Sequence, residues 1–381
     1  MNEGMTVIAD NDFRAWGTLL RRNPIIVDHA HLRTILAGKS VLVTGAGGWI
    51  GSALTKALAA HDPAHLVLVD ASEHALYEID RAMRERDDAP PHTSVLGNIC
   101  DRLTMADIFV RHVPQIVYHA AAYKHVPLME RNPFAAVQNN ALGTYTLAQV
   151  AADCRTEQLI MISTDKAADP VSIMGASKRL AELVLMAAAA GHVKWKALRL
   201  GNVIGSHGSV VPLFAQQIAR GGPVTVTHRH ARRYFLTTQE AVECLLLAAS
   251  GDFGTAILVP ELGEPVLIEH IARHMLAQLS SSGAAPVPIV YTGLRTGDKM
   301  VEALLATHES ITASSSFLRV VDSSAIPSDL LHRTLRELGS CCRNCDADEL
   351  LRLMLRAIPE YQPSELLLHP HTTVLERVPT A

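Results

Sequence analysis

A glycine-rich turn between an apolar strand and a helix constrains the fold of this chain more than any other feature. The turn follows the apolar run 40–44 and opens a helical pattern over 50–60. In this kind of turn one glycine permits a tight bend, a second lets backbone N–H groups approach a pyrophosphate, and a third lets the helix pack closely on the strand. We therefore expect a dinucleotide cofactor to lie against the residues of this turn. They are Gly45, Gly47, Gly48, Trp49, Ile50 and Gly51.

An acidic residue at the end of the next strand indicates which dinucleotide binds. Asp70 ends the apolar run 65–69, about 20 residues beyond the glycines, where a carboxylate can bind the 2′-hydroxyl of a ribose. No Arg follows directly, and an acid would repel a 2′-phosphate, so we expect NAD rather than NADP. The alternative is an ordinary glycine-rich turn followed by an Asp that caps a helix.

Residues 40–200 repeat the alternation of strand and helix. This alternation predicts a parallel, doubly wound sheet of the Rossmann type, which is an α/β fold. After Gly201 the rhythm loosens into turn clusters and shorter elements, which predicts a smaller α/β substrate domain. We expect four parts: an N-terminal arm at 1–38, an NAD-binding Rossmann domain at 39–200, a mainly substrate-binding part at 201–310 that interleaves with it, and a C-terminal helical segment and tail at 311–381.

Three details of these parts can be compared directly with a structure. The arm carries two apolar patches, 16–20 and 25–27, which we expect to pack on the main body. The polar run Thr312-Ala-Ser-Ser-Ser316 is typical of a surface connection. Two helices are expected around 330–338 and 350–358.

Composition excludes several classes of function. The 34 Lys and Arg against 38 Asp and Glu give a formal net charge of −4, and aromatic residues make up 4% of the chain. A protein that grips nucleic-acid phosphates needs a basic excess, and one that stacks single-stranded bases needs more aromatic residues, so we expect no nucleic-acid partner. No run approaches the roughly 18 apolar residues of a membrane-spanning helix, so we expect no membrane span.

Cysteine usage and the first residues indicate the compartment. The six cysteines lack the regular spacing of a secreted disulfide scaffold, and residues 1–39 contain no signal-like apolar segment. We therefore expect a soluble, reduced, cytoplasmic protein. Cys342 and Cys345 form a Cys-x-x-Cys pattern without a second pair or a His at ligand spacing, so we expect no metal site.

Two further segments follow strands and are expected to face the cofactor. Asn98 and Ile99 follow the third strand, where they would line the adenine. Ala120, Ala121 and Ala122 follow the fourth, where small side chains let the backbone lie near the nicotinamide ribose. Ordinary packing at strand ends is the alternative for both segments.

The candidate catalytic residues follow the fifth strand. Ser163-Thr164-Asp165-Lys166 stands at the carboxyl end of that strand, where open α/β sheets place their chemistry. An adjacent acid and amine can act as general acid and base if burial and mutual charge adjust their pKa values. The alternative is a surface turn with a local ion pair. Downstream, Met174 and Lys178 have the spacing of the Tyr-x-x-x-Lys pair of short-chain dehydrogenases/reductases, in which the Lys would hydrogen-bond the nicotinamide ribose.

Further motifs run in one order over about residues 40–305, and one more stands near the end of the chain. They are Thr44–Gly51, His119–Glu130, Asn140–Thr144, Ser163–Lys166, Met174–Lys178, Arg199–Ser206, Gly221–Thr227, Arg233–Thr237, Gly293–Lys299 and Ile358–Tyr361. Together they resemble an extended short-chain dehydrogenase/reductase of the nucleotide-sugar 4,6-dehydratase type, the polysaccharide-biosynthesis family that acts on UDP-N-acetylglucosamine.

The resemblance implies a reaction that yields a 4-keto-6-deoxy sugar. Hydride passes from C4 of the sugar to NAD⁺, a base removes the C5 proton, water leaves from C6 with help from an acid, and the hydride returns to C6. Lys166 would be the base, Asp165 the acid, and Thr164 would orient the C4 hydroxyl. For Lys166 to act as a base near neutral pH its pKa must be lowered, by burial or by a neighbouring cation such as Lys124 or Lys178.

Met174 departs from the catalytic Tyr of the superfamily. A thioether neither gives nor takes a proton, so one hypothesis is that activity is lost. The other is that Thr164, Asp165 and Lys166 suffice, as in a branch of the family that resembles this chain in carrying Met at this place. Members of that branch keep the C5 configuration, and we expect the same here.

The resemblance also implies a set of substrate contacts. Arg233 and Arg295 are expected to bind the two phosphates of a UDP-linked amino sugar, because Arg can hold phosphate through two hydrogen bonds. Asn202 would contact a phosphate or the sugar, and Lys124 and His125 would border the hexose. A surface ion pair is the alternative for each arginine. A homo-oligomer is also expected, because this fold commonly pairs subunits through helices.

Two other functions stay open. A nucleotide-sugar 4-epimerase or reductase uses the same fold without losing water. A catalytically silent NAD or nucleotide-sugar sensor would account for Met174. The product formed from a UDP-hexosamine discriminates among the three.

Overall fold

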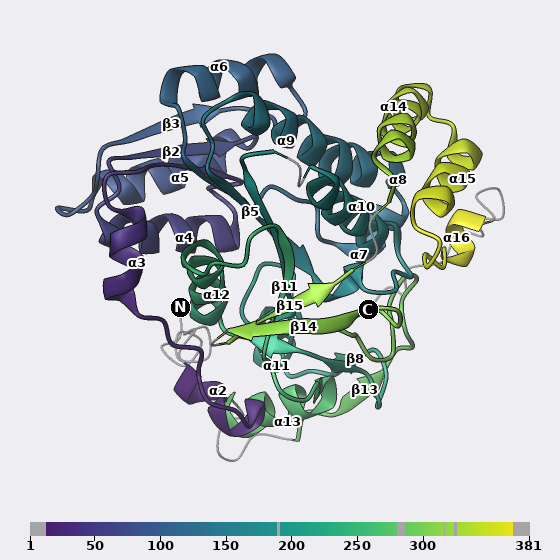
Figure 1. The fold of residues 1–381 in the computed structure, drawn as a ribbon. Helices are drawn as coiled ribbons and strands as arrows, with labels where there is room; N and C mark the ends of the chain where they lie inside the picture. The colour runs from purple at the N-terminus through teal and green to yellow at the C-terminus, as the bar shows by residue number, and fades with distance from the viewer. Residues whose placement is uncertain (1–12, 189–190, 280–285, 316, 324–325, 369–381) are drawn as a thin grey trace.

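A nine-stranded sheet forms the centre of the molecule (Figure 1). The computed structural model describes residues 13–188, 191–279, 286–315, 317–323 and 326–368. The strands are β1 Ser40–Thr44, β2 His65–Asp70, β3 His92–Leu96, β4 Ile116–His119, β5 Gln158–Thr164, β6 Lys194–Leu200, β11 Ala256–Pro260, β14 Ser310–Ser315 and β15 Leu318–Asp322. Across the sheet they run in the order β14-β15-β11-β6-β5-β4-β1-β2-β3.

The strands from β3 to β11 in this order pair in parallel. The order reverses at β1, because the chain first runs outward to β3 and then returns to place β4 on the other side of β1. At such a switch point the segments that leave the carboxyl ends of two neighbouring strands diverge and make room for a ligand. The doubly wound α/β sheet expected from the sequence is confirmed.

The far edge of the sheet corrects one expectation. The polar run 312–316 is not a surface connection, because residues Ser310–Ser315 form β14, which pairs antiparallel with β15. Residue 316 lies outside the described residues. Most side chains of β14 are exposed, since the strand lies at an edge where polar residues meet water on both faces. The polar composition of this segment therefore predicted that it is exposed, but it did not predict that the backbone is a β-strand.

Helices cover both faces of the sheet, because successive residues of a strand point to opposite sides. In β1, Leu42 packs in one core while Val41 and Val43 pack in the other. The first core includes α6 Arg102–His112, α9 Gly143–Asp153, α10 Ile173–Ala187, α14 Ser328–Asn344 and α15 Ala347–Ala357. The second includes α3 His29–Leu36, α4 Trp49–Leu58, α5 Glu73–Arg84 and α12 Thr238–Ser250. The helices expected around 330–338 and 350–358 are confirmed as α14 and α15.

The arm packs on the main body through both of its apolar patches, as expected. Trp16 and Leu20 of α2 Phe13–Leu20 join a third apolar cluster with α11 Val210–Ala219 and α13 Ile268–Leu279. Ile25 and Val27 join the second core beside α3. Burial of these side chains fixes the arm against α11 and α13 and against the second core of the main sheet.

Short strands beyond β6 bring the later site residues close to the main sheet. β7 Asn202–Val203 pairs with β10 Phe235–Leu236, β9 Arg232–Arg233 with β12 Val266–Leu267, and β8 Val224–Val226 with β13 Ile289–Tyr291. The remaining elements are η1 Ala59–His61, α7 Val126–Glu130, α8 Pro133–Ala136, η2 Val137–Leu142, η3 Asp165–Ala167 and α16 Glu365–Leu368. Because β11, β14 and β15 also lie beyond residue 200, the later chain serves both the main sheet and these outer strands.

Three structural facts concern anchors, metals and disulfides. No helix in the described part of the chain is long and apolar enough to cross a membrane. Within the same residues no group of three His, Cys, Asp or Glu side chains is placed to hold a metal ion. All six cysteines are free thiols.

Candidate active site

The glycine-rich turn joins β1 to α4 with almost no room for side chains. Gly45 has φ +67°, and a Cβ on it would lie 2.7 Å from the backbone nitrogen of Ala121. A Cβ on Gly47 would lie 2.4 Å from the carbonyl carbon of Ala75, and one on Gly51 would lie 2.0 Å from the carbonyl oxygen of Gly45. Close approach of backbone to backbone therefore requires glycine at these positions.

The first turn of α4 is open to an anion. Its N-cap residue, Gly48, offers no side-chain hydrogen bond, so the first N–H groups of the helix stay available at the positive end of the helix dipole. The Trp49 indole donates to the Thr238 hydroxyl at 2.8 Å, and its ring meets the His207 ring edge-on at 4.8 Å between centroids. Trp49 thereby ties the turn to α12 and to the loop after β7.

Asp70 braces the turn from the end of β2. Its Oδ2 accepts a hydrogen bond from the Gly47 N–H at 2.9 Å, and its Oδ1 accepts one from the Ser72 N–H at 2.9 Å. The N-cap of α5 is Ser72, whose hydroxyl accepts from the Ala75 N–H, so Asp70 is not the helix cap that the alternative supposed. The half-buried carboxylate lies beside the glycine-rich turn, and its contact with a ribose stays a prediction.

The segment after β3 is shaped by local structure and packing. Asn98 is exposed, and its Oδ1 accepts from the Cys100 N–H at 2.9 Å, which closes a turn. Ile99 is 3% exposed and packs in the first core, where its Cδ1 would lie 2.8 Å from a Cβ on Gly143. The Ile99 side chain thus serves the core, and an adenine contact of either residue stays a prediction.

The segment after β4 lies directly over the turn. The Ala120 N–H donates to the Thr44 carbonyl at 3.0 Å, and the Ala121 backbone is the surface that a Cβ on Gly45 would strike. Ala122 is exposed. The structure therefore brings Ala120 and Ala121 beside the glycine-rich turn, and a contact of these alanines with the nicotinamide ribose stays a prediction.

Thr164, Asp165 and Lys166 form one hydrogen-bonded unit at the carboxyl end of β5. The Thr164 hydroxyl donates to Asp165 Oδ1 at 2.9 Å, and the Lys166 ammonium donates to the same oxygen at 2.8 Å. Asp165 is fully buried, and its Oδ2 has no hydrogen-bond partner among the described residues. The unit is therefore a buried acid with a largely buried amine and not an exposed surface turn.

Residues from later in the chain close around Lys166. Its ammonium donates to Asn202 Oδ1 at 3.2 Å and lies 3.8 Å from Glu302 Oε1. Arg233 Nε lies 3.7 Å from the same Glu302 oxygen, and Lys299 Nζ lies 4.0 Å from Glu302 Oε2. The sequence predicted Asn202 and Arg233 as site residues, whereas Glu302 was missed. Its only signal was its place three residues after the motif that ends at Lys299.

Lys166 holds a proton in this arrangement. Burial opposes its charge, but Asp165 and Glu302 outweigh burial, so the pKa of Lys166 is raised above its ordinary value. The expectation that the pKa of Lys166 is lowered is therefore wrong, because the two acids outweigh burial and the charge of Arg233. Burial raises the pKa of Glu302, although the cations around it oppose that rise. Lys166, the candidate base, thus lies beside Glu302, which binds a proton more readily than an exposed Glu does.

Met174 and Lys178 lie one turn apart on α10. Met174 is 3% exposed and packs in the first core. Lys178 is 4% exposed, burial lowers its pKa to about 8, and no hydrogen bond to its ammonium occurs within the described residues. The neighbouring His119 lies between the hydroxyls of Thr44 at 2.8 Å and Thr144 at 2.9 Å. Burial and the charge of Lys178 lower the pKa of His119 to about 3, so this imidazole is neutral.

Lys124, His125 and Arg295 form a more exposed group. Burial lowers the pKa of His125, and the charges of Lys124 and Arg295 lower it further. The His125 ring packs against Gly208, where a Cβ would lie 2.5 Å from its Cε1. The side chain of Arg295 is 61% exposed, and its Nε donates to Asp298 at 2.9 Å. In this structure Arg295 thus forms the surface ion pair that the sequence left open, and its phosphate contact stays a prediction.

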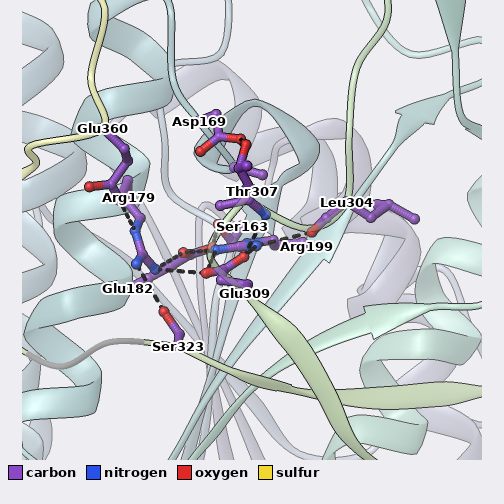
Figure 2. A network of polar contacts seen from close by, with 12 residues as sticks. Ser163, Asp169, Arg179, Glu182, Arg199, Leu304, Thr307, Glu309, Ser323 and Glu360 are labelled. Carbon is purple, nitrogen blue, oxygen red and sulfur yellow. Dashed lines mark hydrogen bonds and ion pairs between the residues drawn. The ribbon is translucent and has the colours of Figure 1, made fainter.

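A buried network of charged residues includes Ser163, which directly precedes Thr164 (Figure 2). Arg199 of β6 is fully buried and donates to Glu182 of α10 at 2.8 and 2.7 Å and to Glu309 at 2.9 Å. Arg179 donates to Glu182 at 3.1 Å and lies 3.4 Å from Glu309. The Ser163 hydroxyl donates to Glu182 at 2.6 Å. The network thereby fixes the end of β5 against α10 and against the segment before β14.

The residues present fit a dinucleotide. The glycine-rich turn provides close backbone approach, and α4 offers free N–H groups for a pyrophosphate. Asp70 places a carboxylate beside the turn, and Lys178 offers an ammonium with no hydrogen-bond partner in the described part of the chain. These groups come from β1, β2 and α10, and the parallel sheet gathers them at one edge.

Comparison with known proteins gives a consistent set of relatives. Residues 41–320 match a family described as "Polysaccharide biosynthesis protein". The chain is 40% identical over 314 residues to the probable polysaccharide biosynthesis protein EpsC of Bacillus subtilis, covering 82% of this chain and 52% of that protein. It is 28% identical over 287 residues to a UDP-N-acetylglucosamine 4,6-dehydratase (inverting) of Campylobacter jejuni, covering 72% and 79%. It is 29% identical over 283 residues to a UDP-glucose 4-epimerase of Rickettsia massiliae, covering 72% and 80%. The chain thus spans about half the length of EpsC.

Solved structures share the fold. Pen from Bacillus thuringiensis aligns with a TM-score of 0.69 at 23% identity, covering 79% of this chain and 98% of that chain. MoeE5 in complex with UDP-glucose and NAD aligns with a TM-score of 0.58 at 25% identity, covering 71% and 90%. A fold that holds NAD in a structural neighbour supports a nicotinamide cofactor for this chain.

The family match, the fold and the site geometry agree. The matched residues 41–320 include the glycine-rich turn, the hydrogen-bonded unit of Thr164, Asp165 and Lys166, and the strands that carry them. The chain belongs to the polysaccharide biosynthesis protein family of extended short-chain dehydrogenases/reductases.

Proposed function

We propose that this protein is an NAD-dependent 4,6-dehydratase of a UDP-N-acetylhexosamine, with UDP-N-acetylglucosamine as the first candidate. The product is the 4-keto-6-deoxy sugar nucleotide, and water is lost from C6. The observation that carries the proposal is the buried unit of Thr164, Asp165 and Lys166. It offers an acid and an amine at the sheet edge where the glycine-rich turn lies, as an elimination next to a carbonyl requires.

The cofactor would be held by the turn and its neighbours. The glycines and the first turn of α4 bind the pyrophosphate, Asp70 binds the adenosine ribose, and Lys178 binds the nicotinamide ribose. The segments 98–99 and 120–122 line the adenine and the nicotinamide ribose. When bound, NAD⁺ supplies an acceptor for the hydride of C4 and a donor of that hydride to C6.

The hydrogen bonds of the catalytic unit define a route for protons. As C4 is oxidised, its hydroxyl proton passes through the Thr164 hydroxyl to Asp165, along the bond of 2.9 Å. The protonated Asp165 then gives that proton to the C6 hydroxyl, which leaves as water. Lys166 takes the C5 proton, which the C4 ketone has made acidic, exchanges its N–H hydrogens with solvent, and later gives a proton back to C5. Return by the same side chain to the same face of the ring gives retention at C5.

This route also accounts for Met174. In the superfamily a phenol at this position handles the proton of the C4 hydroxyl, and a thioether does not. Here Thr164 and Asp165 take over that task, because their hydrogen bond already joins a hydroxyl to a buried carboxylate. Met174 then contributes packing in the first core beside Lys178.

The substrate would lie between the deep cations and the more exposed group. Around Glu302 and Asp165 stand the three cations Lys166, Arg233 and Lys299, which leaves one positive charge in excess for an anionic ligand. Arg233 and Arg295 bind the two phosphates, Asn202 contacts a phosphate or the sugar, and Lys124 and His125 border the hexose. The diphosphate of a UDP-sugar matches this charge.

The product formed in heavy water tests the proposal. Purified protein is incubated with UDP-N-acetylglucosamine and NAD⁺ in D₂O, and the sugar nucleotide is analysed by mass spectrometry and NMR. A 4-keto-6-deoxy product with deuterium at C5 is expected. Lys166→Ala should abolish water loss, whereas Lys39→Ala, at an exposed pair with Glu157, serves as the control that keeps it. Full activity of Lys166→Ala would remove Lys166 as the base.

A 4-epimerase is the second candidate, because the chain is also similar to a protein of that name. Both activities begin with oxidation at C4, so they share the cofactor site and the contact to the C4 hydroxyl. They differ afterwards, since an epimerase keeps the C6 hydroxyl and exchanges no hydrogen at C5. A C4 epimer without deuterium would therefore replace the dehydratase proposal, and unchanged substrate with bound NAD would favour a sensor.

A further inference from the structure

A buried carboxylate next to the catalytic unit carries a further inference, which rests on the proposed dehydratase function. Glu302 is 3% exposed, and its Oε1 lies 3.8 Å from the Lys166 ammonium and 3.7 Å from Arg233 Nε. Its Oε2 lies 4.0 Å from Lys299 Nζ and has no hydrogen-bond partner among the described residues. Burial of a carboxylate oxygen without a hydrogen bond is costly, so its place beside the catalytic amine calls for a chemical reason.

A count of the protons in the proposed reaction shows that Lys166 needs a nearby proton acceptor, which Glu302 can provide. Oxidation at C4 delivers one proton to Asp165, which holds it for the departing C6 hydroxyl. Lys166 is protonated at rest, so it must lose one proton before it can take another from C5. A carboxyl group that already holds a proton is a poor acceptor for a second, which removes Asp165 from this role. Asn202 is a neutral amide, so Glu302 is the anionic group left facing the ammonium in the described part of the chain.

We propose that Glu302 is a positioning residue of the dehydration: through one water that bridges the 3.8 Å between Glu302 Oε1 and Lys166 Nζ, its carboxylate takes a proton from the Lys166 ammonium and returns it at the end of the cycle. The step breaks one N–H bond of Lys166 and forms one O–H bond on Glu302. It leaves a neutral amine beside a neutral acid and moves no electron between molecules. After Lys166 has given its proton back to C5, the proton on Glu302 restores the ammonium.

The surrounding charges and burial act on the two forms of the pair in opposite directions. Asp165 at 2.8 Å favours the ammonium form of Lys166. Arg233 and Lys299 favour the carboxylate form of Glu302, whereas burial raises the pKa of Glu302 and favours the acid. Transfer also removes two buried charges at once, which a medium of low polarity favours. An exposed pair of Lys and Glu would lack this last contribution.

An internal transfer has a distinct pH signature. The pair keeps the same total number of protons, so the rate of deuterium entry at C5 should be independent of pH from about 6.5 to 9. In Glu302→Gln the proton must leave to solvent, so the rate at pH 7 should fall at least tenfold. It should then rise about tenfold per pH unit until Lys166 titrates. Glu302→Asp should restore a flat profile, and Glu261→Gln, at a surface pair with Arg319, should keep the wild-type one.

The coupling of Glu302 to Lys166 is also measurable without turnover. Lys166 is acetylated with acetic anhydride at a series of pH values, and its modified fraction is read by peptide mass spectrometry. The midpoint should shift to lower pH in Glu302→Gln and stay unchanged in Glu261→Gln. An acetylation midpoint that is unchanged in Glu302→Gln overturns the proposal. A rate of deuterium entry that falls equally at every pH in Glu302→Gln also overturns it, as does a wild-type rate that rises with pH. If no UDP-hexosamine is turned over, the proposed function fails, while the midpoint still decides whether Glu302 controls Lys166.

Discussion

Replacing Glu309 by Gln should destabilise the protein by a pH-dependent amount. Glu309 accepts two hydrogen bonds from Arg199 and lies 3.4 Å from Arg179, and its side chain is fully buried. Burial opposes its charge, but the hydrogen bonds from Arg199 outweigh burial and lower the pKa of Glu309 to about 2. Gln keeps the shape and one acceptor while removing the charge that the guanidinium groups stabilise.

The size of the effect follows from the shift in pKa. The ordinary value is 4.5, so the folded state lowers the pKa by roughly 2.5 units, which corresponds to about 3 kcal/mol. A carboxyl whose pKa is lowered by folding contributes this stability above the unfolded pKa and loses it as pH falls toward the folded one. By pH 3.5 about 1.4 kcal/mol of the contribution should be gone.

Urea unfolding of both proteins at pH 7 and pH 3.5 measures this difference. The free energy of unfolding of Glu309→Gln should lie about 3 kcal/mol below that of the wild type at pH 7, and the gap should shrink to about 2 kcal/mol at pH 3.5. Glu360→Gln is the control: Glu360 pairs with Arg179 at 3.0 Å but is partly exposed, so its loss should cost under about 1 kcal/mol. A gap below about 1 kcal/mol at pH 7, or one that does not change with pH, would refute the reasoning.

Two further substitutions test the cofactor site. Lys178→Met removes a buried ammonium whose pKa is about 8, so it should raise the free energy of unfolding at pH 7 by up to about 3 kcal/mol. This gain in stability should shrink toward pH 9. Calorimetry should also show that the variant binds NAD⁺ more weakly. A loss of stability at pH 7 would contradict this. Gly51→Ala forces a Cβ to within 2.0 Å of the Gly45 carbonyl oxygen, so it should cost about 1–3 kcal/mol and lower the affinity for NAD⁺. Gly339→Ala, in α14 with its nearest contact at 3.7 Å, should be neutral or stabilising, and equal losses from both would show that packing at Gly51 is not special.

Much of the fold was predictable because its signals are local. The runs that became β1, β2 and β5 are apolar and β-branched, and parallel strands buried on both faces read in this way. Once the strands are parallel, their carboxyl ends meet at one edge, so Thr164 and Gly45 had to lie on the same side of the sheet. Asn202 follows β6 in the same manner, and its contact with Lys166 follows from that placement.

The rest depends on contacts between distant segments that no local pattern records. Glu302 is buried and lies 3.7 Å from Arg233, and the apolar residues on either side of it in the sequence do not reveal which charged groups it meets. The sign of the Lys166 pKa shift depends on that same acid, so it was predicted in the wrong direction. β14 is polar because it is an edge strand, and composition alone reads such a segment as a connection.

Transfer of a label within the sugar tests the central claim most directly. UDP-N-acetylglucosamine carrying deuterium at C4 is incubated with the protein and NAD⁺ in ordinary water, and the product is examined by ²H NMR and mass spectrometry. A 4,6-dehydratase moves the label from C4 to the new methyl group at C6, and this is the result we predict. Label that stays at C4 of an epimer, or substrate that is recovered unchanged, would contradict the account.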